Sequence, residues 1–574
     1  MRNEYPRPEL VRADYKILNG NWEFDFDFGD SGVFQEFFKK DSFSKTINVP
    51  FCPESKLSGI EYKDYIPSCW YMKKIRYDEY KSGRLLINFE ASYHKTEIYV
   101  NGVFVDKHVG GYTAFTFDIT DYFKKGEENI ICVHTTGDPR DPTQPCGKQT
   151  NTKYESWGCW YTRTSGIYGT LWLEIVPESY LKSYKCYPDI TNSSISFDFD
   201  LVGNGQKEIE LDISFKGEHL ATKTIKTTQN FAKTTVELSK LYLWDIGQGN
   251  LYDLIIKVKS NGSVDTVNTY FGMREVKTVG KDFYLNGRKI FQRLVLDQGY
   301  HPDGVLTFPS ADIFKADIER ALACGFNGAR MHQRVFDRLY IHEADKLGFL
   351  TWGEYACWGF DNSLPDGEKY FIPEWREAME RDFNHPSIVC WCPFNETFEF
   401  WNASKNPPRM ELIKNVFDYT KNYDKTRPVQ DASGNYHVKT DIYGIHTYEQ
   451  NVEKFAELFE PMKKGGEVYD NYPTKQSYNG SVYMVDEYGG ISSVGDSGGY
   501  GATPKGLEEF LTRLEGLTDV LVSNPYIAGF CYTQLYDVEQ EKNGIYKYDR
   551  SPKYDEETTK KIKNIIGKSA EYEK

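Results

Sequence analysis

The sequence of 574 residues has no run of about 20 apolar residues, the length that a transmembrane helix needs. Its first residues, MRNEYPRPELV, contain no apolar segment typical of a signal peptide, so we expect a cytoplasmic protein without a membrane partner. Basic side chains number 69 and acidic ones 84, and the net charge of −15 argues against binding to nucleic acid. The eleven cysteines include no paired CxxC motifs, and no histidines cluster at zinc spacing. We therefore expect reduced packing cysteines, no metal site and no cofactor.

Hydrophobic residues make up 40% of the chain and aromatic residues 16%, which excludes a mainly disordered protein. At about 150 residues per domain, the length predicts three to four domains. The large aromatic share suits the faces of β-sheets, and it also suits the flat faces of sugars.

Two strand-rich segments come first. Residues 1–178 contain short strands, with Asn101-Gly102 as a hairpin turn between two of them, and this spacing predicts a β-sandwich. Residues 179–277 hold at least five short strands with polar alternation, the size and pattern of an immunoglobulin-like sandwich.

From residue 278 to 574, apolar strands alternate with amphipathic helices. The expected strands cover residues 290–296, 328–331, 349–354, 388–394, 428–432, 442–445, 482–485 and 527–533, and the expected helices cover 310–324, 336–347, 373–383, 409–421, 452–458, 505–517 and 556–566. This pattern predicts a (β/α)₈ TIM barrel. An open doubly wound sheet would normally carry a glycine-rich phosphate loop after its first strand, and none is present.

In a barrel of this kind the chemistry lies at the carboxyl ends of the strands. The residues just after the expected strands are polar or aromatic: Asp297, Gln298, Tyr300 and His301; Arg330 and His332; Glu354 and Trp358; Asn395 and Glu396; His446 and Tyr448; Asp486 and Glu487; Gln534, Asp537 and Glu539. We expect substrate contacts from Asp297, Gln298, Tyr300, Asn395, His446, Tyr448 and Gln534, with Trp358 stacking on a sugar.

Two carboxylates are enough for glycoside hydrolysis, and Glu396 and Glu487 are the best candidates. Strands four and seven lie on opposite sides of the barrel mouth, so the two side chains can face each other across a sugar. A retaining enzyme needs about 5–5.5 Å between the carboxyl groups, and an inverting one about 6.5–9.5 Å. Asp486 competes with Glu487, but on an alternating strand it points to the opposite face.

Several long segments, in the right order, resemble glycoside hydrolase family 2, the family of β-galactosidases and β-glucuronidases. The segments are LNGNWEF (18–24), VPFCPES (49–55), VNGVFVDKHVGGYTAFTFDIT (100–120), YTRTSGIYGTLWLE (161–174), LDQGYHPDG (296–304), HPSIVCWCPFNE (385–396), VDEYGG (485–490) and GFCYTQLYDVEQEKNGIYKYDRSPK (529–553). The resemblance implies a sugar-binding jelly-roll domain, an immunoglobulin-like domain and a catalytic barrel. It also implies a retaining mechanism, with Glu396 as acid/base and Glu487 as nucleophile, and sugar contacts from Arg330, His332 and Asn395.

The departures from the family concern the metal and the sugar. Its well-known β-galactosidases hold magnesium with a Glu-x-His segment after strand three, which this sequence lacks at Glu354. Its β-glucuronidases grip the substrate carboxylate with Asn-x-Lys, where this chain has Glu541-Lys542-Asn543. A tryptophan common in large β-galactosidases is replaced by Gln534. We therefore expect a neutral sugar and no required metal.

The leading expectation is an exo-acting retaining β-glycosidase on oligosaccharides or glycosides, with a β-galactoside as default. Alternatives in the same fold are an α-L-arabinosidase or a β-galactofuranosidase and, less favoured, a β-glucuronidase. A non-catalytic carbohydrate-binding protein and a structural or adaptor protein are alternatives of other classes, and a homo-oligomer is possible. The proline-rich loop 139–148 (PRDPTQPCGK) either reaches the barrel mouth or is an inert surface loop.

Overall fold

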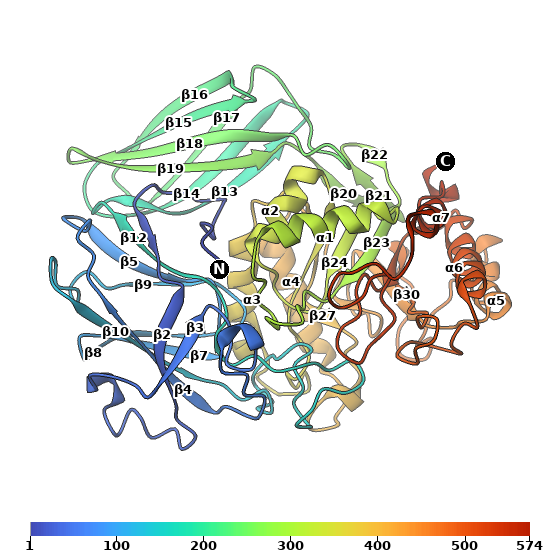
Figure 1. Cartoon of the computed structure of the whole chain (residues 1–574). Helices are drawn as coiled ribbons and strands as arrows, with labels where there is room; N and C mark the ends of the chain where they lie inside the picture. Colours follow the sequence, from blue (N-terminus) through green and yellow to red (C-terminus); the bar gives the residue numbers. More distant parts are fainter. Residues whose placement is uncertain (1) are drawn as a thin grey trace.

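The computed structural model describes residues 2–574 as two β-sandwiches that flank a barrel (Figure 1). The N-terminal sandwich, in blue, lies at the lower left, the second sandwich, in green, lies across the top, and the barrel fills the right side. The predicted fold class, two sandwiches followed by a TIM barrel, is confirmed.

The N-terminal sandwich consists of a six-stranded sheet in the order β3-β2-β4-β10-β7-β8 and a four-stranded sheet in the order β1-β12-β5-β9. Their strands are β1 (Tyr15–Ile17), β2 (Gly20–Phe26), β3 (Lys45–Val49), β4 (Ser68–Ile75), β5 (Arg84–Phe89), β7 (Lys95–Val100), β8 (Val103–Val109), β9 (Phe115–Asp118), β10 (Asn129–Thr136) and β12 (Leu171–Val176), with β6 (Ser92–Tyr93) and β11 (Gly166–Ile167) as a separate pair. Trp22 and Phe24 of one sheet pack against Ile87 of the other in a buried core. The predicted hairpin is present, because Asn101 (φ 52°) and Gly102 (φ 76°) join β7 to β8 with the positive φ values that such a tight turn requires.

The second sandwich pairs a three-stranded sheet, β13-β14-β17, with a four-stranded sheet, β16-β15-β18-β19. Its strands are β13 (Tyr180–Asp189), β14 (Ser194–Val202), β15 (Lys207–Phe215), β16 (Glu218–Thr227), β17 (Phe231–Glu237), β18 (Leu251–Ser260) and β19 (Ser263–Gly272). Buried residues alternate strictly along β15, so Leu211 and Ile213 pack on Phe197 of the facing sheet while charged neighbours face out.

The barrel follows a small sheet of β20 (Val276–Val279), β21 (Asp282–Leu285) and β22 (Arg288–Lys289). Seven parallel strands form one sheet in the order β26-β25-β24-β23-β31-β30-β29. They are β23 (Gln292–Asp297), β24 (Gly328–Met331), β25 (Leu350–Glu354), β26 (Ile388–Cys392), β29 (Ile442–Thr447), β30 (Val482–Gly489) and β31 (Ile527–Thr533). The short β28 (Ala432–Ser433) lies between β27 (Phe394–Asn395) and β29 and completes the ring.

The helices around the barrel are α1 (Asp312–Ala323), α2 (Arg338–Leu347), α3 (Glu368–Asp382), α4 (Met410–Tyr423), α5 (Val452–Lys463), α6 (Leu507–Val522) and α7 (Glu556–Ile566). Several expected bounds were wrong by one to five residues; helices α5 and α6, for example, each end five residues beyond the expected 458 and 517. The expected strand 428–432 is divided into an isolated bridge of Val429 to Trp391 and the short β28, because Asp431 between them donates its backbone N–H to Thr440 Oγ1 at 3.3 Å. Helix α3 begins five residues before Pro373, because Phe371 packs between Tyr355 and Phe394 and anchors an extra turn.

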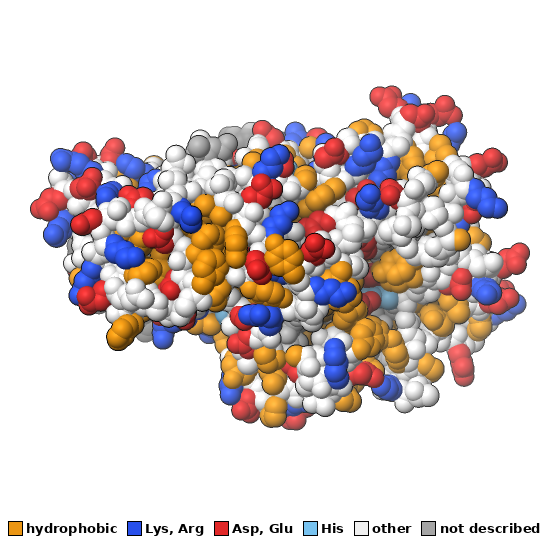
Figure 2. Space-filling model, turned by 60° about the horizontal axis from the view of Figure 1, so that its bottom comes forward, with side chains coloured by type: hydrophobic (Ala, Val, Ile, Leu, Met, Phe, Trp, Pro, Cys, Tyr) orange, Lys and Arg blue, Asp and Glu red, His pale blue; other side chains and the backbone are white. Residues whose placement is uncertain are grey.

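Buried ion pairs tie the three units together. Arg338 on α2 binds Glu90 of the first sandwich at 2.9 Å and also pairs with Glu9. Arg12 binds Asp265 of the second sandwich at 2.8 Å and Glu174 of the first at 3.1 Å. On the face in Figure 2, acidic and basic side chains are interspersed and hydrophobic ones gather near the middle. None of the helices within residues 2–574 is long and apolar enough to cross a membrane.

Candidate active site

The two candidate carboxylates meet at the carboxyl end of the barrel. Glu396 follows β27 and Glu487 belongs to β30, and carboxylate oxygens of the two side chains lie within 4.8 Å of each other. Glu396 has a left-handed backbone (φ 44°), an arrangement that costs a non-glycine residue about 1–3 kcal/mol. Its backbone N–H donates to Ser433 O at 2.9 Å, which fixes this conformation and directs the side chain to the mouth.

Glu487 is held in its ionised form. Its Oε1 accepts from Arg330 Nη1 at 3.1 Å, its Oε2 accepts from the Tyr448 hydroxyl, and His446 Nδ1 lies 3.5 Å from Oε2. Burial alone would raise the pKa of Glu487, but His446, Arg330, His332 and the Tyr448 hydroxyl outweigh it and hold the pKa at about 2.

Arg330 connects the other polar residues of the site. Its fully buried guanidinium donates to Glu354 Oε1 at 2.5 Å and to Asn395 Oδ1 at 3.0 Å, besides Glu487. The remaining Glu354 oxygen lies 3.0 Å from His332 Nδ1. Asn395 Nδ2 is buried and has no hydrogen-bond partner within residues 2–574. An unpaired buried amide donor beside two carboxylates is suited to a sugar hydroxyl.

His446 bridges the two glutamates. Its Nδ1 lies 2.8 Å from Glu396 Oε1 and its Nε2 lies 2.8 Å from Ser433 Oγ, while Ser433 Oγ donates to Asp486 Oδ2 at 2.7 Å. Since Ser433 uses its proton on Asp486, it accepts from His446, so both ring nitrogens act as donors. Burial would lower the pKa of His446, but the carboxylates of Glu487, Asp486 and Glu396 raise it. The geometry and the pKa both favour an imidazolium.

The residues do not fit a catalytic metal. Glu396, His446 and Glu487 are close enough to hold an ion, but an imidazolium repels a cation and Glu487 is already paired with Arg330. Both oxygens of Glu354, at the position where the family's β-galactosidases hold magnesium, are occupied by Arg330 and His332. The expectation of no required metal stays a prediction.

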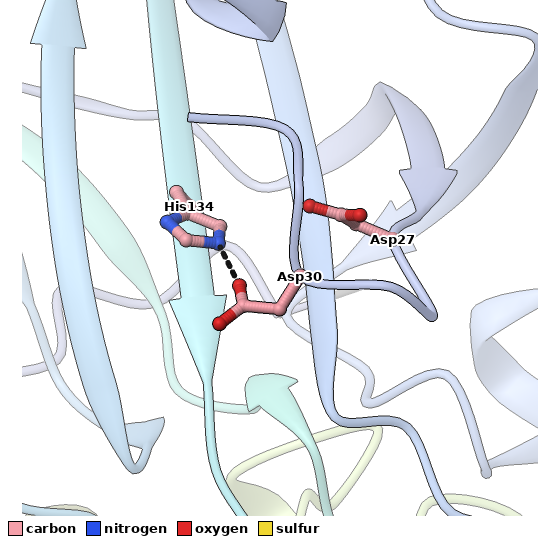
Figure 3. A group of neighbouring side chains, drawn as sticks. All are labelled: Asp27, Asp30 and His134. Carbon is pink, nitrogen blue, oxygen red and sulfur yellow. Dashed lines mark ion pairs between the residues drawn. The ribbon is translucent and has the colours of Figure 1, made fainter. Parts of the chain in front are cut away.

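A second group of side chains close enough to hold a metal ion lies in the N-terminal sandwich and consists of Asp27, Asp30 and His134 (Figure 3). His134 Nε2 lies 3.4 Å from Asp30 and 2.8 Å from Ser68 Oγ, and Asp27 accepts from Trp70 Nε1 at 3.1 Å. These contacts satisfy the side chains and tie a turn to β10, so the cluster needs no ion.

The mouth is lined by aromatic side chains from two domains. Trp358 donates its indole N–H to Asn395 O at 2.9 Å, and its ring lies 5.0 Å from Trp160 and 4.5 Å from Trp401. On the opposite side, Tyr448 stacks on Tyr500 at 3.7 Å. The loop 139–148 reaches the barrel, because Cys146 N donates to Trp358 O at 2.8 Å and Asp361 N to Pro142 O at 2.8 Å.

The structure thus brings most of the sequence-predicted residues into one network: Glu396, Glu487, Arg330, His332, Asn395, His446 and Tyr448, with Trp358 directly behind Asn395. Asp486 is fully buried and bonds to Gln430 and Ser433, which leaves the mouth to Glu487.

The remaining predicted residues lie further out. Asp297 turns away from the network, and burial together with the nearby Asp317 raises its pKa to about 6. Gln298 lies below the loop 139–148, beside Lys148, and the Tyr300 ring lies 4.9 Å from Tyr161. Gln534 donates to Asn543 Oδ1 at 2.8 Å, and Asn543 Nδ2 donates to Glu541 at 3.2 Å.

Sequence reasoning missed the contributions of Lys148, Tyr161, Ser433 and Tyr500. Lys148 and Tyr161 belong to the first domain, and no strand-end rule for a barrel selects them. The three prolines of the loop 139–148 were the one available signal for Lys148. Ser433 is the last residue of β28 and lies one residue beyond the expected end of strand five.

Three models that make up the family described as glycosyl hydrolases family 2 match the chain in order. The sugar-binding domain matches residues 15–137, the central domain 179–274 and the TIM barrel domain 339–566. The chain belongs to this family.

Individual relatives are distant. A β-galactosidase of Thermoanaerobacterium thermosulfurigenes is 25% identical over 493 residues, 82% of this chain and 64% of the relative. A β-glucuronidase of Sus scrofa is 22% identical over 468 residues, 74% of this chain and 69% of the relative. The chain spans between 51% and 64% of the length of the first three relatives that it matches.

Among solved structures, a β-glucuronidase from Ruminococcus gnavus in complex with D-glucuronic acid superposes with a TM-score of 0.79. The two sequences are 20% identical, and the match covers 98% of this chain and 99% of the other. This likeness shows the shared fold.

Proposed function

We propose that the protein is a retaining exo-β-glycosidase that removes a terminal, neutral, β-galactoside-like sugar from oligosaccharides or glycosides. The observation that carries this proposal is the approach of the Glu396 and Glu487 carboxylates to within 4.8 Å. This bound on an oxygen–oxygen distance supports the spacing of about 5–5.5 Å between carboxyl groups in retaining enzymes and argues against the about 6.5–9.5 Å of inverting ones. Family membership supports the same reaction.

In the first step, Glu487 attacks the anomeric carbon and Glu396 gives its proton to the departing oxygen. Arg330 and the Tyr448 hydroxyl hold Glu487 ionised for the attack. In the second step, Glu396 takes a proton from water, which attacks the anomeric carbon and breaks the ester bond to Glu487. Asn395 Nδ2 is placed to bind the sugar 2-hydroxyl, a contact that strengthens in the transition state.

His446 is placed to serve both glutamates during the cycle. Its imidazolium stabilises the charge on Glu487 at the start of the cycle. When attack on the sugar consumes that charge, the imidazolium remains 2.8 Å from Glu396 and stabilises the carboxylate that forms as Glu396 gives up its proton. One cation therefore serves two carboxylates in turn.

The charges around the site favour a neutral sugar. Besides Glu396, which carries a proton at the start of the cycle, the acidic groups Glu354, Asp486, Glu487 and Glu541 outnumber the cationic Arg330, His446 and Lys148. Glu541 stands where β-glucuronidases of the family carry the first residue of their carboxylate grip, and its charge opposes a uronate. Relatives named β-galactosidase and β-glucuronidase make the galactoside the default and the glucuronide the chief comparison.

The test is a set of initial rates on aryl β-galactoside, β-glucoside, β-glucuronide, β-mannoside, β-galactofuranoside and both ring forms of α-L-arabinoside. We expect turnover of a neutral glycoside, and proton NMR should show the anomer of the substrate as the first product. Glu487→Gln should lower kcat by at least about 10⁴-fold. Glu399→Gln, the same change at a carboxylate that binds Tyr436 outside the network, is the control and should remain active.

Two results would contradict the proposal. Inversion of the anomeric centre would refute the roles of the two glutamates. Sugar binding by calorimetry without turnover of any glycoside would favour the alternative, a carbohydrate-binding protein with an inactive barrel.

A further inference from the structure

One cation in the candidate site comes from the first domain. Lys148 ends the loop 139–148, and its side chain is only 7% exposed. Its Nζ lies 4.1 Å from the centre of the Trp358 ring, which is itself hydrogen-bonded to Asn395 beside Glu396. The lysine therefore lies at the mouth of the site, over the tryptophan that contacts Asn395.

The backbone around Lys148 is fixed to the barrel. Gly147 N donates to Ala356 O at 3.2 Å and to Trp358 O at 3.0 Å. On the other side, Tyr161 N donates to Lys148 O at 2.7 Å, so the two residues are carried on one ribbon. Because the backbone of Lys148 is held from both sides, the residue is preorganised. The entropy cost of ordering it is met when the chain folds and not when a ligand binds.

The ammonium has no partner of its own. No carboxylate oxygen in residues 2–574 lies within 4.0 Å of Lys148 Nζ, and no acceptor lies within hydrogen-bonding distance. Burial alone would lower the pKa of Lys148, but Cys159 and the carboxylates of Glu541, Glu487 and Glu396 raise it, so the group is a cation. The Lys148 residue is mostly buried, but its Nζ is not among the fully buried unpartnered nitrogens, so the ammonium is open to the mouth, where a ligand acceptor can replace water.

Glu541, on the loop after β31, is one of the carboxylates whose charge acts on Lys148. The Tyr161 hydroxyl donates to one Glu541 oxygen, and Asn543 Nδ2 donates to the other at 3.2 Å. Tyr161 is hydrogen-bonded through its backbone to Lys148. The two residues therefore bring the Lys148 ammonium, a donor, and the Glu541 carboxylate that Tyr161 binds, an acceptor, to the same side of the site. A neutral hydroxyl can accept from the one and donate to the other, whereas a carboxylate can only accept.

We propose that Lys148 is a specificity-determining residue that donates a hydrogen bond to a hydroxyl oxygen of a neutral terminal sugar, on the side of the site bounded by Glu541. The inference rests on the proposed glycosidase function. It makes the first domain part of the substrate site and gives the loop 139–148 a direct role in sugar selection.

The experiment compares Lys148→Met with Lys153→Met in the full chain. Methionine keeps the apolar stem over Trp358 and removes only the charge and the donors. Lys153 is a matched control, since its Nζ lies 4.2 Å from the Trp157 ring in the same kind of contact but its side chain is exposed to solvent. The readout is kcat/KM on the best aryl glycoside, on its monodeoxy analogues and on the corresponding uronide.

We expect Lys148→Met to lower kcat/KM on the neutral glycoside by about 10- to 100-fold, the value of one charge-assisted hydrogen bond, and Lys153→Met to change it less than twofold. The monodeoxy analogue that lacks the contacted hydroxyl should be a slow substrate of the wild type, and Lys148→Met should turn it over at the same kcat/KM as the wild type. If Lys148 had a merely structural role, the variant would be slower than the wild type on this analogue as well.

Equal rates for the two lysine variants with an active wild type would overturn this inference and leave the glycosidase proposal standing. A wild type that prefers the uronide, with that preference lost in Lys148→Met, would also overturn it, because the ammonium would then bind a carboxylate. A wild type that is inactive on every glycoside would refute the proposed function itself.

Discussion

Gly147 holds the loop 139–148 against the barrel, and we expect alanine at this position to lower both stability and catalytic activity. Gly147 has φ +58°, and a Cβ there would lie 2.8 Å from Gln333 O and 3.3 Å from Ala356 Cβ. The first contact is with a backbone carbonyl in a buried turn, which has little freedom to move. The loop must therefore shift, and it carries Lys148 with it.

Gly158 is the matched comparison. Its φ of +54° is nearly the same, but a Cβ there meets nothing within 4 Å. Alanine at either position bears the cost of a left-handed backbone, about 1–2 kcal/mol. Gly147→Ala also loses the two hydrogen bonds from Gly147 N, at about 1 kcal/mol each, so we expect a total destabilisation of about 3–4 kcal/mol.

The two variants should differ most in catalysis. A displacement of 1 Å can cost about 100-fold in rate, so a shift of a few tenths of an ångström should lower kcat/KM of Gly147→Ala by about tenfold. Gly158→Ala should lose stability but retain kcat/KM. The measurements are initial rates on the best aryl glycoside and urea-induced unfolding. Equal kcat/KM for both variants, or a larger loss in Gly158→Ala, would refute the argument from contact distances.

Three further predictions concern charge and metal. Tyr448→Phe removes a donor to Glu487, so the pKa of that carboxyl should rise from about 2, the acid limb of the kcat/KM profile should move to higher pH, and kcat/KM should fall by about tenfold. Burial would raise the pKa of Glu174, but Arg7 and Arg12 outweigh it and lower the pKa from 4.5 to about 2. Because the folded value lies below the unfolded one, up to about 3 kcal/mol of stability should be present above pH 4.5 and be lost as the pH falls toward 2, as urea unfolding at several pH values would show. Prolonged dialysis against EDTA should leave activity unchanged, and a loss that added magnesium restores would contradict the analysis of Glu354.

The regular parts of the fold follow from local sequence signals. Strand β24, strand β31 and helix α7 have the predicted bounds, because each combines an unbroken apolar pattern with clear flanking residues. The failures occur where side chains compete with the backbone. Strand five is interrupted at Asp431, whose backbone N–H donates to Thr440 Oγ1, and no residue pattern reveals that contact in advance.

The candidate site divides in the same way. The strand-end rule selects Glu396, Glu487, Arg330 and His446, because parallel strands deliver their last residues to one edge. It also selects Asp297, whose side chain points to the outside of the barrel since side chains alternate along a strand. It cannot select Lys148, whose contact with the barrel is set by tertiary packing over 200 residues away in the sequence.

The first domain is therefore bound to the barrel by the same groups that complete the site. Trp160, Tyr161 and Cys146 belong to one continuous buried cluster with the barrel core, although all three lie in the first domain. Apolar burial of this kind is the main force that holds domains in a fixed relation. A barrel produced alone would keep Glu396 and Glu487 but would expose that surface and lose Lys148. On this reasoning the separation of catalysis from sugar selection follows the domain boundary: the barrel supplies the two glutamates, and the ribbon from the sandwich supplies the lysine that discriminates among sugars.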